Sequence, residues 1–275
     1  MKVAIIGGAG KMGAWFAAHF ARGHDVSAFD VKPFLIENVK STASIASCVA
    51  GADLVMVCVP VSKTPAIVRQ CASSMKSGST IAEISSVKSK THPALKKVRS
   101  DITPLCIHPM YGPGANEKKQ LKMLLVPVRD ARAETVLVRE LFPKMSLQAL
   151  PSARMHDRAI AAVLGLTYFV NVAFAGMLAK EKLATLKQVG GTTFGVQSML
   201  AESVMTDEPE LISALIRDNP YSAGYIQQYL KNAQELAGAT QGKLATRLKR
   251  TKSLLQRQQD LQESYRRMYE MLQGR

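Results

Sequence analysis

The sequence has 275 residues, of which 47% are hydrophobic, so it is long enough for one large domain or two ordinary ones with buried cores. Such a composition excludes a disordered chain. The 36 lysines and arginines against 21 acidic residues give a net charge of +15, which favours anionic partners: metabolites, nucleotides, nucleic acid or acidic lipids.

The first half of the chain alternates short apolar segments with helical ones, which predicts a parallel sheet covered by helices. The segment Asp53–Val59 is apolar after its first residue and ends at Pro60, as expected for a strand buried on both faces. Helices are expected over Met12–Arg22 and Arg132–Leu141. The other strands are expected over Lys2–Ile6, Asp25–Phe29, Ser79–Ile84, Leu105–His108, Leu121–Val128 and Ser146–Ala149.

From Pro151 onward the strand pattern stops, and Gly or Pro separates helical segments. A domain boundary is therefore expected near this residue, between an α/β domain over 1–150 and an all-helical domain over 151–275. Helices are expected over Ala153–Gln188, Thr193–Met205, Pro209–Arg217 and Ser222–Ala237, followed by a tail, Thr240–Arg275, with one apolar stripe and a cationic face.

The segment Ala159–Ala179 carries no charge and is long enough to cross a bilayer. It is rich in alanine and includes Gly165 and Asn171, whereas lipid-facing helices usually carry more Leu, Ile and Phe. We therefore expect no membrane span and interpret the segment as the central helix of a bundle or as an oligomer interface. The expected assembly is a homodimer with helical domains packed together.

The four cysteines, Cys48, Cys58, Cys71 and Cys106, include no C-x-x-C pair. Cys58 and Cys106 lie in apolar, strand-like segments, where a buried free thiol is the usual interpretation. The first residues, MKVAIIGGAG, lack the apolar core and cleavage site of a signal peptide. These features predict a cytoplasmic protein, because thiols stay reduced there.

A glycine-rich turn, Gly8-Ala9-Gly10-Lys11-Met12-Gly13, follows the first strand and opens a helix. In a dinucleotide site, Gly8 permits the tight turn, Gly10 lets the backbone approach the pyrophosphate, and Gly13 lets the helix pack on the strand. The helix N-terminus then offers N–H groups to the phosphates. Asp30, at the end of the second strand, is placed to bond the ribose 2′-hydroxyl, so NAD is expected, with NADP possible because Lys32 is near.

Polar side chains follow two later strands. His108 ends one strand and opens the segment HPMYGPG, whose Pro and Gly residues indicate a shaped loop at the sheet edge. A histidine there can deprotonate a substrate hydroxyl as hydride leaves the same carbon, although a capping or core histidine is the plainer alternative. Ser86 and Lys88 follow another strand end, so their side chains are expected on the same rim, where Ser86 is also a candidate helix N-cap.

The ordered set GGAGKMG, CVP, SSVK, HPMYGPG and Met155-His156-Asp157-Arg158 resembles the prephenate and arogenate dehydrogenases of tyrosine biosynthesis, over residues 1–240. The resemblance implies a Rossmann-type, doubly wound, mainly parallel domain followed by a helical domain for substrate binding and dimerisation. It implies NAD-dependent oxidative decarboxylation of prephenate to 4-hydroxyphenylpyruvate, or of arogenate to tyrosine.

The same resemblance implies roles for single residues. His108 corresponds to the histidine that accepts the proton of the ring hydroxyl, and Ser86 to the serine that orients both groups. Pro60, in CVP, belongs to the cofactor site. His156 corresponds to the histidine of the family's HD motif, which either supports the site or contacts substrate, while Asp157 alternatively caps the helix that it opens.

Two positions depart from the family pattern. Tyr168 stands where many members have a histidine, and Gly195 stands where bacterial members have an arginine for the substrate carboxylate. A buried carboxylate needs paired donors, so another cation or hydroxyl is expected to bind it. The candidates are Arg158, Lys88, Lys118, Tyr168 or a basic residue of a partner subunit.

Two other interpretations remain open. One is another NAD(P)-dependent small-acid dehydrogenase of the 3-hydroxyacid type, but such enzymes carry a catalytic lysine on the interdomain helix, where this chain has Asn171. The other is a non-catalytic nucleotide-binding or nucleic-acid-associated protein that uses the tail. Because the tail has no recognised nucleic-acid motif, its cationic face is interpreted as solvated, and neither a nucleic-acid partner nor a metal site is expected.

Overall fold

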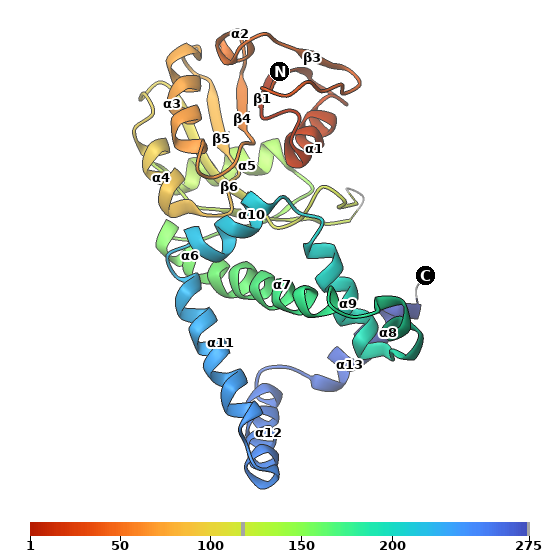
Figure 1. Ribbon diagram of the computed structural model, residues 1–275. Coiled ribbons are helices and arrows are strands. Elements are labelled where there is room, and N and C mark those ends of the chain that lie inside the picture. The colour runs from red at the N-terminus through yellow and green to blue at the C-terminus, as the bar shows by residue number, and fades with distance from the viewer. Residues whose placement is uncertain (117–118, 274–275) are drawn as a thin grey trace. The chain divides into compact units, whose positions relative to one another are not determined.

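The computed structural model describes residues 1–116 and 119–273 and divides into two compact units, Met1–Ile160 and Ala161–Arg275 (Figure 1). The helix after Pro151, α6 (Ala153–Ile160), belongs to the first unit because it packs against α4 (Lys88–Lys96). The compact α/β unit therefore extends beyond residue 150 by this one helix.

The first unit contains an eight-stranded sheet in the order β3-β2-β1-β4-β5-β6-β7-β8. All neighbouring pairs are parallel except β6 and β7. The predicted doubly wound, mainly parallel sheet is thus confirmed. The strands are β1 (Lys2–Ile6), β2 (Asp25–Phe29), β3 (Val39–Ser41), β4 (Leu54–Val57), β5 (Thr80–Glu83), β6 (Thr103–Pro109), β7 (Lys122–Leu125) and β8 (Ser146–Ala149).

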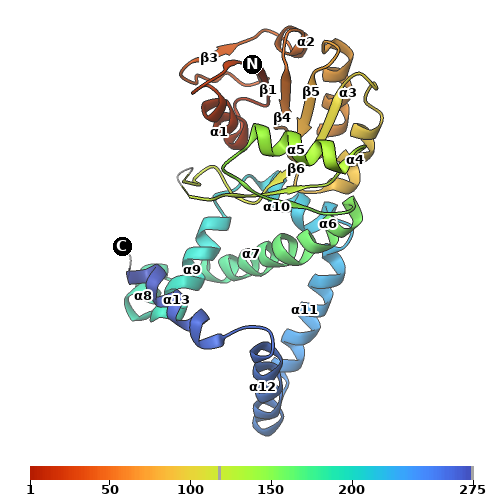
Figure 2. The same cartoon turned by 180° about the vertical axis from the view of Figure 1, so that it is seen from behind.

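Helices cover both faces of this sheet, because successive residues of a strand point to opposite faces and both sets are apolar (Figures 1 and 2). Ala4 and Ile6 of β1 pack with the core under α2, α3 and α4, whereas Val3 and Ile5 pack with the core under α1 and α5. The helices not yet given are α1 (Lys11–Phe20), α2 (Ile45–Val49), α3 (Thr64–Ser74) and α5 (Ala131–Leu141).

The described residues of the second unit form helices and no strand, as predicted. Gly165 lets two of its segments approach closely, since a Cβ there would stand 2.3 Å from Ser222 Oγ. Its elements are the π-helical turns η1 (Ala161–Leu166) and η2 (Ala214–Asp218) and the helices α7 (Thr167–Leu178), α8 (Leu183–Val189), α9 (Thr192–Val204), α10 (Pro209–Ser213), α11 (Ser222–Ala237), α12 (Gln241–Gln256) and α13 (Leu261–Gln273).

The long helix predicted to reach Gln188 ends earlier, at Leu178. The N–H groups of Lys180 and Glu181 bond to carbonyl oxygens three residues back, which tightens the last turn and closes the helix. A new helix, α8, then begins at Leu183.

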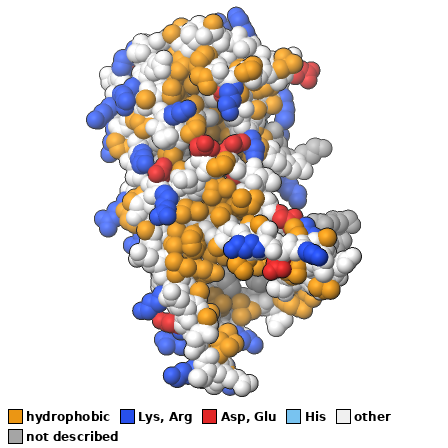
Figure 3. Space-filling model, viewed as in Figure 1, with side chains coloured by type: hydrophobic (Ala, Val, Ile, Leu, Met, Phe, Trp, Pro, Cys, Tyr) orange, Lys and Arg blue, Asp and Glu red, His pale blue; other side chains and the backbone are white. Residues whose placement is uncertain are grey.

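Among the described residues, the helical stretch Ala153–Leu178 is long and apolar enough, by length and composition alone, to cross a membrane. Within the most apolar 18 residues of this stretch, only 22% are buried. Its exposed apolar side chains include Val163 and Met177, and Figure 3 shows hydrophobic side chains gathered on the surface over α7. The low burial argues against a central bundle helix within one chain.

Candidate active site

The turn between β1 and α1 requires glycine at two places. Gly13 lies so close to the turn that a Cβ would stand 1.9 Å from the carbonyl oxygen of Gly7, which explains how α1 packs tightly against β1. Gly7, which the sequence did not single out, has a φ of +97°, and a Cβ on it would stand 2.4 Å from Cys58 O. The backbone therefore closes here without side chains in the way, as a phosphate-binding turn requires.

The start of α1 presents backbone amides to the glycine turn. Its N-cap is Gly10, which provides no side-chain cap, and the N–H of Ala14 donates to Gly10 O at 2.8 Å, closing the first helical turn. The amides of Met12 and Gly13, which lie between these residues, therefore have no carbonyl partner within the helix. Such amides, together with the helix dipole, favour an anion such as a pyrophosphate.

Asp30 lies beside this turn, at the end of β2. Its Oδ2 accepts the N–H of Ala9 at 3.0 Å and its Oδ1 accepts the N–H of Lys32 at 2.9 Å. Gly8 is in contact with Phe34, and Pro60 is exposed just after β4. The predicted cofactor residues therefore share the carboxyl edge of the parallel strands β1, β2 and β4, and the donors and the carboxylate fit a dinucleotide.

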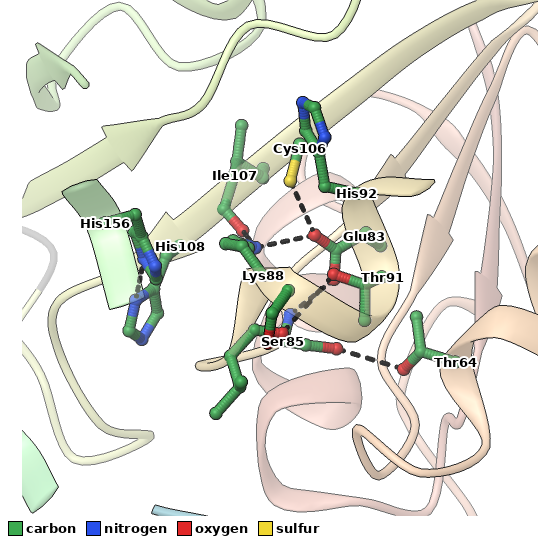
Figure 4. A network of polar contacts seen from close by, with 12 residues as sticks. Thr64, Glu83, Ser85, Lys88, Thr91, His92, Cys106, Ile107, His108 and His156 are labelled. Atoms are coloured by element: carbon green, nitrogen blue, oxygen red, sulfur yellow. Dashed lines mark hydrogen bonds and ion pairs between the residues drawn. The ribbon is translucent and has the colours of Figure 1, made fainter. Parts of the chain in front are cut away.

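His108 lies near the carboxyl end of β6 at the same edge of the sheet, and its ring is only 3% exposed. Its Nδ1 lies 3.0 Å from Nε2 of His156, which is fully buried on α6 (Figure 4). Burial, and then the nearby His156 and Lys88, hold the pKa of His108 well below its ordinary value. The ring is therefore neutral at neutral pH.

His156 in turn contacts the carboxylate of Asp157, with 2.8 Å between Nδ1 and Oδ1. Burial lowers the pKa of His156, although the hydrogen bond to Asp157 opposes that shift. Burial also raises the pKa of Asp157, but hydrogen bonds from His156 and from the Lys88 and Ser89 amides outweigh it and leave this pKa lowered. The result is a buried line of an ionised carboxylate and two neutral imidazoles.

The sequence offered Asp157 as a cap of its own helix, α6. In the structure, Asp157 instead caps the start of α4. Its Oδ1 accepts the N–H of Lys88 and its Oδ2 accepts the N–H of Ser89, both at 2.8 Å. The candidate cap Ser86 is replaced in this role: the residue at the cap position is Val87, which has no side-chain acceptor. A carboxylate at a helix N-terminus satisfies free amides and interacts favourably with the helix dipole.

The prediction that Lys88 lies on the rim of the sheet is wrong, because its side chain is fully buried. Its Nζ donates to Oε1 of Glu83 at 2.6 Å and to the carbonyl oxygen of Ile107 at 2.5 Å (Figure 4). The helix that begins at Lys88 directs this side chain toward the sheet, where the fully buried Glu83 neutralises it. Lys88 is therefore removed from the candidates for the substrate carboxylate.

Glu83 is the centre of a wider buried network. It also accepts a hydrogen bond from the thiol of Cys106 at 3.0 Å and from the N–H of Ser85 at 2.9 Å. Ser85 Oγ lies 3.0 Å from Thr64 Oγ1, and Thr64 also donates to Pro60 O in the loop after β4. The network thus joins the cofactor edge to the strand that carries His108. The only sequence signal for it was an acidic residue inside an apolar strand.

The remaining predicted residues are placed as follows. Ser86 is half-buried in the loop before α4, and Arg158 is exposed on α6, so both stay predictions. Tyr168, in the second unit, donates its hydroxyl to Asp207 at 2.7 Å, and Asn171 bonds with Thr167 O and Gln197. Lys118 lies outside the described residues.

Elsewhere among the described residues, neither the pocket at the other sheet edge nor a metal site competes with this one. A depression of about 690 Å³ lies at the opposite, amino-terminal edge of the sheet, between Arg22, His24 and Lys76, and contains none of the predicted residues. Within residues 1–116 and 119–273, no group of three His, Cys, Asp or Glu side chains is placed to hold a metal ion.

Comparison with known proteins agrees with this geometry. Residues 15–127 match the family described as "Prephenate dehydrogenase, nucleotide-binding domain". A probable arogenate/prephenate dehydrogenase of Methanocaldococcus jannaschii is 23% identical over 251 residues, covering 86% of this chain and 53% of the relative. The T-protein of Haemophilus influenzae is 24% identical, covering 82% of this chain and 58% of its own length. The chain therefore spans just over half the length of these curated relatives.

Solved structures show the same fold. A prephenate dehydrogenase from A. aeolicus, in complex with hydroxyphenyl propionate and NAD+, superposes with a TM-score of 0.68 at 18% identity, covering 94% of this chain and 98% of that one. The resemblance noted in the sequence is matched by the family model over residues 15–127 and is confirmed at the level of the fold.

Proposed function

We propose that the chain is a member of the prephenate and arogenate dehydrogenases and catalyses the NAD-dependent oxidative decarboxylation of prephenate or arogenate, because residues 15–127 match the nucleotide-binding domain of that family. The observation that carries the proposal is the position of His108. This neutral imidazole lies at the same carboxyl edge as the glycine turn and Asp30, where open α/β sheets bind their ligands.

In the proposed reaction, Nε2 of His108 accepts the proton of the ring hydroxyl while hydride leaves the same carbon. NAD, when bound, accepts that hydride. The ring then loses its carboxylate as CO2 and becomes aromatic, which supplies the driving force. The turn from Gly8 to Gly13 would hold the pyrophosphate, with Pro60 beside it, and Asp30 the adenine ribose.

Among described residues, His108 makes its side-chain hydrogen bond through Nδ1 only. No described buried side-chain nitrogen or oxygen lacks a partner, so Nε2 is the ring atom that reaches the surface. An unprotonated nitrogen at that position is the base that the reaction needs. Ser86, half-buried one loop away, is proposed to orient the hydroxyl, and the exposed Arg158 is the remaining cation proposed for a substrate carboxylate in the first unit.

The reaction is tested by incubating the full chain with prephenate or arogenate and with NAD or NADP, and following reduction of the nicotinamide. Reduction with one of these substrates, accompanied by release of CO2, supports the proposal. Reduction with a 3-hydroxy acid instead would support the small-acid dehydrogenase. Asn171 argues against that alternative, because its side chain is buried and bonded to Thr167 and Gln197.

We also propose a homodimer formed by the helical unit. Apolar side chains are exposed along η1, α7 and α9, including Val163, Met177 and Leu200, and an exposed apolar surface of this kind marks an interface. Light scattering at micromolar concentration is the test, and a monomeric mass would contradict the proposal.

A cytoplasmic location is proposed on the state of the cysteines. All four are free, and burial raises the pKa of Cys71 to about 12, so this thiol is unreactive. No nucleic-acid partner is proposed for the basic helix α12, where Arg247 bonds to Glu235 and Asn232 of α11. Fractionation of cells that express the chain would test the location.

A further inference from the structure

Asp157, His156 and His108 form a buried hydrogen-bonded line. The distances are 2.8 Å from Asp157 to His156 and 3.0 Å from His156 to His108, and the exposed fraction of each side chain is 3% or less. Both ring nitrogens of His156 are used, one toward each neighbour.

The direction of the hydrogen bonds along this line is set by the carboxylate. Asp157 accepts the amide hydrogens of Lys88 and Ser89 and has a lowered pKa, so it is ionised and can only accept. Nδ1 of His156 must therefore donate to it. Because burial lowers the pKa of His156, its Nε2 keeps a lone pair and accepts the Nδ1–H of His108.

We propose that Asp157 and His156 are positioning residues that hold His108 in the tautomer protonated on Nδ1, which leaves Nε2 as the base. The inference rests on the proposed function of His108. When Nε2 takes a proton, the resulting imidazolium keeps its Nδ1–H bond to His156, and the negative charge of Asp157 stabilises it through the neutral ring between them. No proton has to move along the line.

Other charged groups face this line. The ammonium of Lys88 and the carboxylate of Glu83 act on it from α4 and β5, and they form an ion pair with each other. The thiol of Cys106 has a pKa raised well above its ordinary value, chiefly by burial, and stays neutral. Among these groups, Asp157 is the ionised one that contacts the line directly, through its hydrogen bond to His156.

Asp157 also caps α4, so the test must separate the two roles. Asparagine caps helices about as well as aspartate. Oδ1 of Asp157 accepts the Lys88 amide and meets His156 Nδ1, whereas Oδ2 accepts the Ser89 amide, so Asp157→Asn can keep only one of the two α4 amide bonds. When the asparagine oxygen stays on the Ser89 amide, its NH2 group faces His156 Nδ1. His156 must accept there and donate from Nε2, which forces the opposite tautomer on His108.

His156→Gln is the matched control. A glutamine amide can donate to Asp157 and accept from His108, so it preserves the polarity of the line without a titrating ring. We expect Asp157→Asn to lose at least about 100-fold in turnover and His156→Gln less than about 10-fold, with unfolding midpoints similar for the two variants. The acid limb of the pH–rate profile should move in both variants, since His156 itself lowers the pKa of His108, and the large loss at the pH optimum should occur in Asp157→Asn alone.

The direct readout is the nitrogen-15 NMR spectrum of the histidines in the protein without substrate or cofactor, with His108 assigned by its loss in His108→Asn. We expect a protonated Nδ1 and an unprotonated Nε2 in the wild type and in His156→Gln, and the reverse in Asp157→Asn. A wild-type His108 protonated on Nε2, or an Asp157→Asn variant with near-normal turnover, would overturn the inference. If the wild type reduces no NAD with either substrate, the proposed reaction fails, but these spectra still decide the tautomer.

Discussion

The carboxylate of Asp157 accepts the backbone N–H of Lys88 at 2.8 Å, although the two residues are 69 positions apart in the chain. This bond joins α6 to the start of α4 and fixes the point from which the Lys88 side chain enters the core. In the core, the Lys88 ammonium donates to the carbonyl oxygen of Ile107, which directly precedes His108. The helix that holds His156 and the strand that holds His108 are thus connected through one buried lysine.

Replacing Lys88 by methionine should therefore destabilise the first unit. The change leaves the carboxylate of Glu83 buried without its cation, and breaking a buried pair in this way typically costs about 3–5 kcal/mol. Urea unfolding of the variant measures the loss. The control is Lys76→Met, because the Lys76–Asp53 pair is nearly half exposed and such pairs contribute about 1 kcal/mol or less. Equal losses in the two variants would contradict the burial argument.

His108→Asn removes the proposed base while keeping a polar side chain of similar size. Turnover should fall by about two orders of magnitude or more, the usual scale for a lost general base. NAD affinity should change little, because the glycine turn and Asp30 bind the dinucleotide in the proposal. Steady-state kinetics and calorimetric titration with NAD measure the two effects. Unchanged turnover would remove His108 from the mechanism.

Asp30→Ala should shift cofactor preference toward NADP. The carboxylate repels a 2′-phosphate at the adenine ribose, and its removal also leaves the Lys32 backbone N–H without this acceptor, so that it can donate to the phosphate. The ratio of NAD to NADP affinities, measured by titration, should therefore fall. A ratio equal to that of the wild type rejects the role of Asp30. Because Asp30 also accepts the Ala9 amide, some loss in affinity for both cofactors is expected.

Stability should fall as the pH is lowered from about 7 to about 5, since free histidine titrates near 6.5. Burial lowers the pKa values of His108 and His156 in the folded chain, so the unfolded chain binds protons in this range that the folded chain does not. Each histidine then contributes up to about 1.4 kcal/mol per pH unit to the loss. Asp157, whose pKa is also lowered, adds to it only below about pH 4.

Urea unfolding across this pH range measures the slope. His156→Gln should reduce it and His108→Asn with His156→Gln should reduce it further, because each change removes one group that must be neutral in the folded state. An unchanged slope in the double variant would show that the acid sensitivity comes from elsewhere in the chain.

Local sequence patterns predicted those strands whose bounds are set by their own residues and by the turns beside them. The strands β1, β2 and β8 have the predicted bounds, because their residues form short segments bounded by turns. In contrast, β3 was missed, since its three residues are polar or half-exposed and its pairing with β2 supplies the only reason for a strand. The π-helical turn η1 was missed as well, because it depends on packing against α11.

The site divides in the same way. The glycine turn, Asp30 and His108 follow strand ends, and the carboxyl edge of a parallel sheet brings such residues together. Asp157 and Lys88 were assigned the wrong environments, because the cap of α4 and the ion pair with Glu83 join segments far apart in the chain. No spacing rule predicts which distant carboxylate meets a helix start or which lysine is buried.

Gly13→Ala tests the turn itself. Its new methyl group would stand 1.9 Å from Gly7 O, so α1 would have to move away from β1. We expect a loss of about 1–3 kcal/mol in stability, the usual cost of overpacking, and a larger proportional loss in NAD affinity because the helix start moves with α1. Gly23→Ala is the control, since a methyl group there meets nothing within 4 Å. If Gly13→Ala binds NAD as tightly as Gly23→Ala, the close approach of α1 is not what shapes the phosphate site, and the glycine at this position matters only for packing.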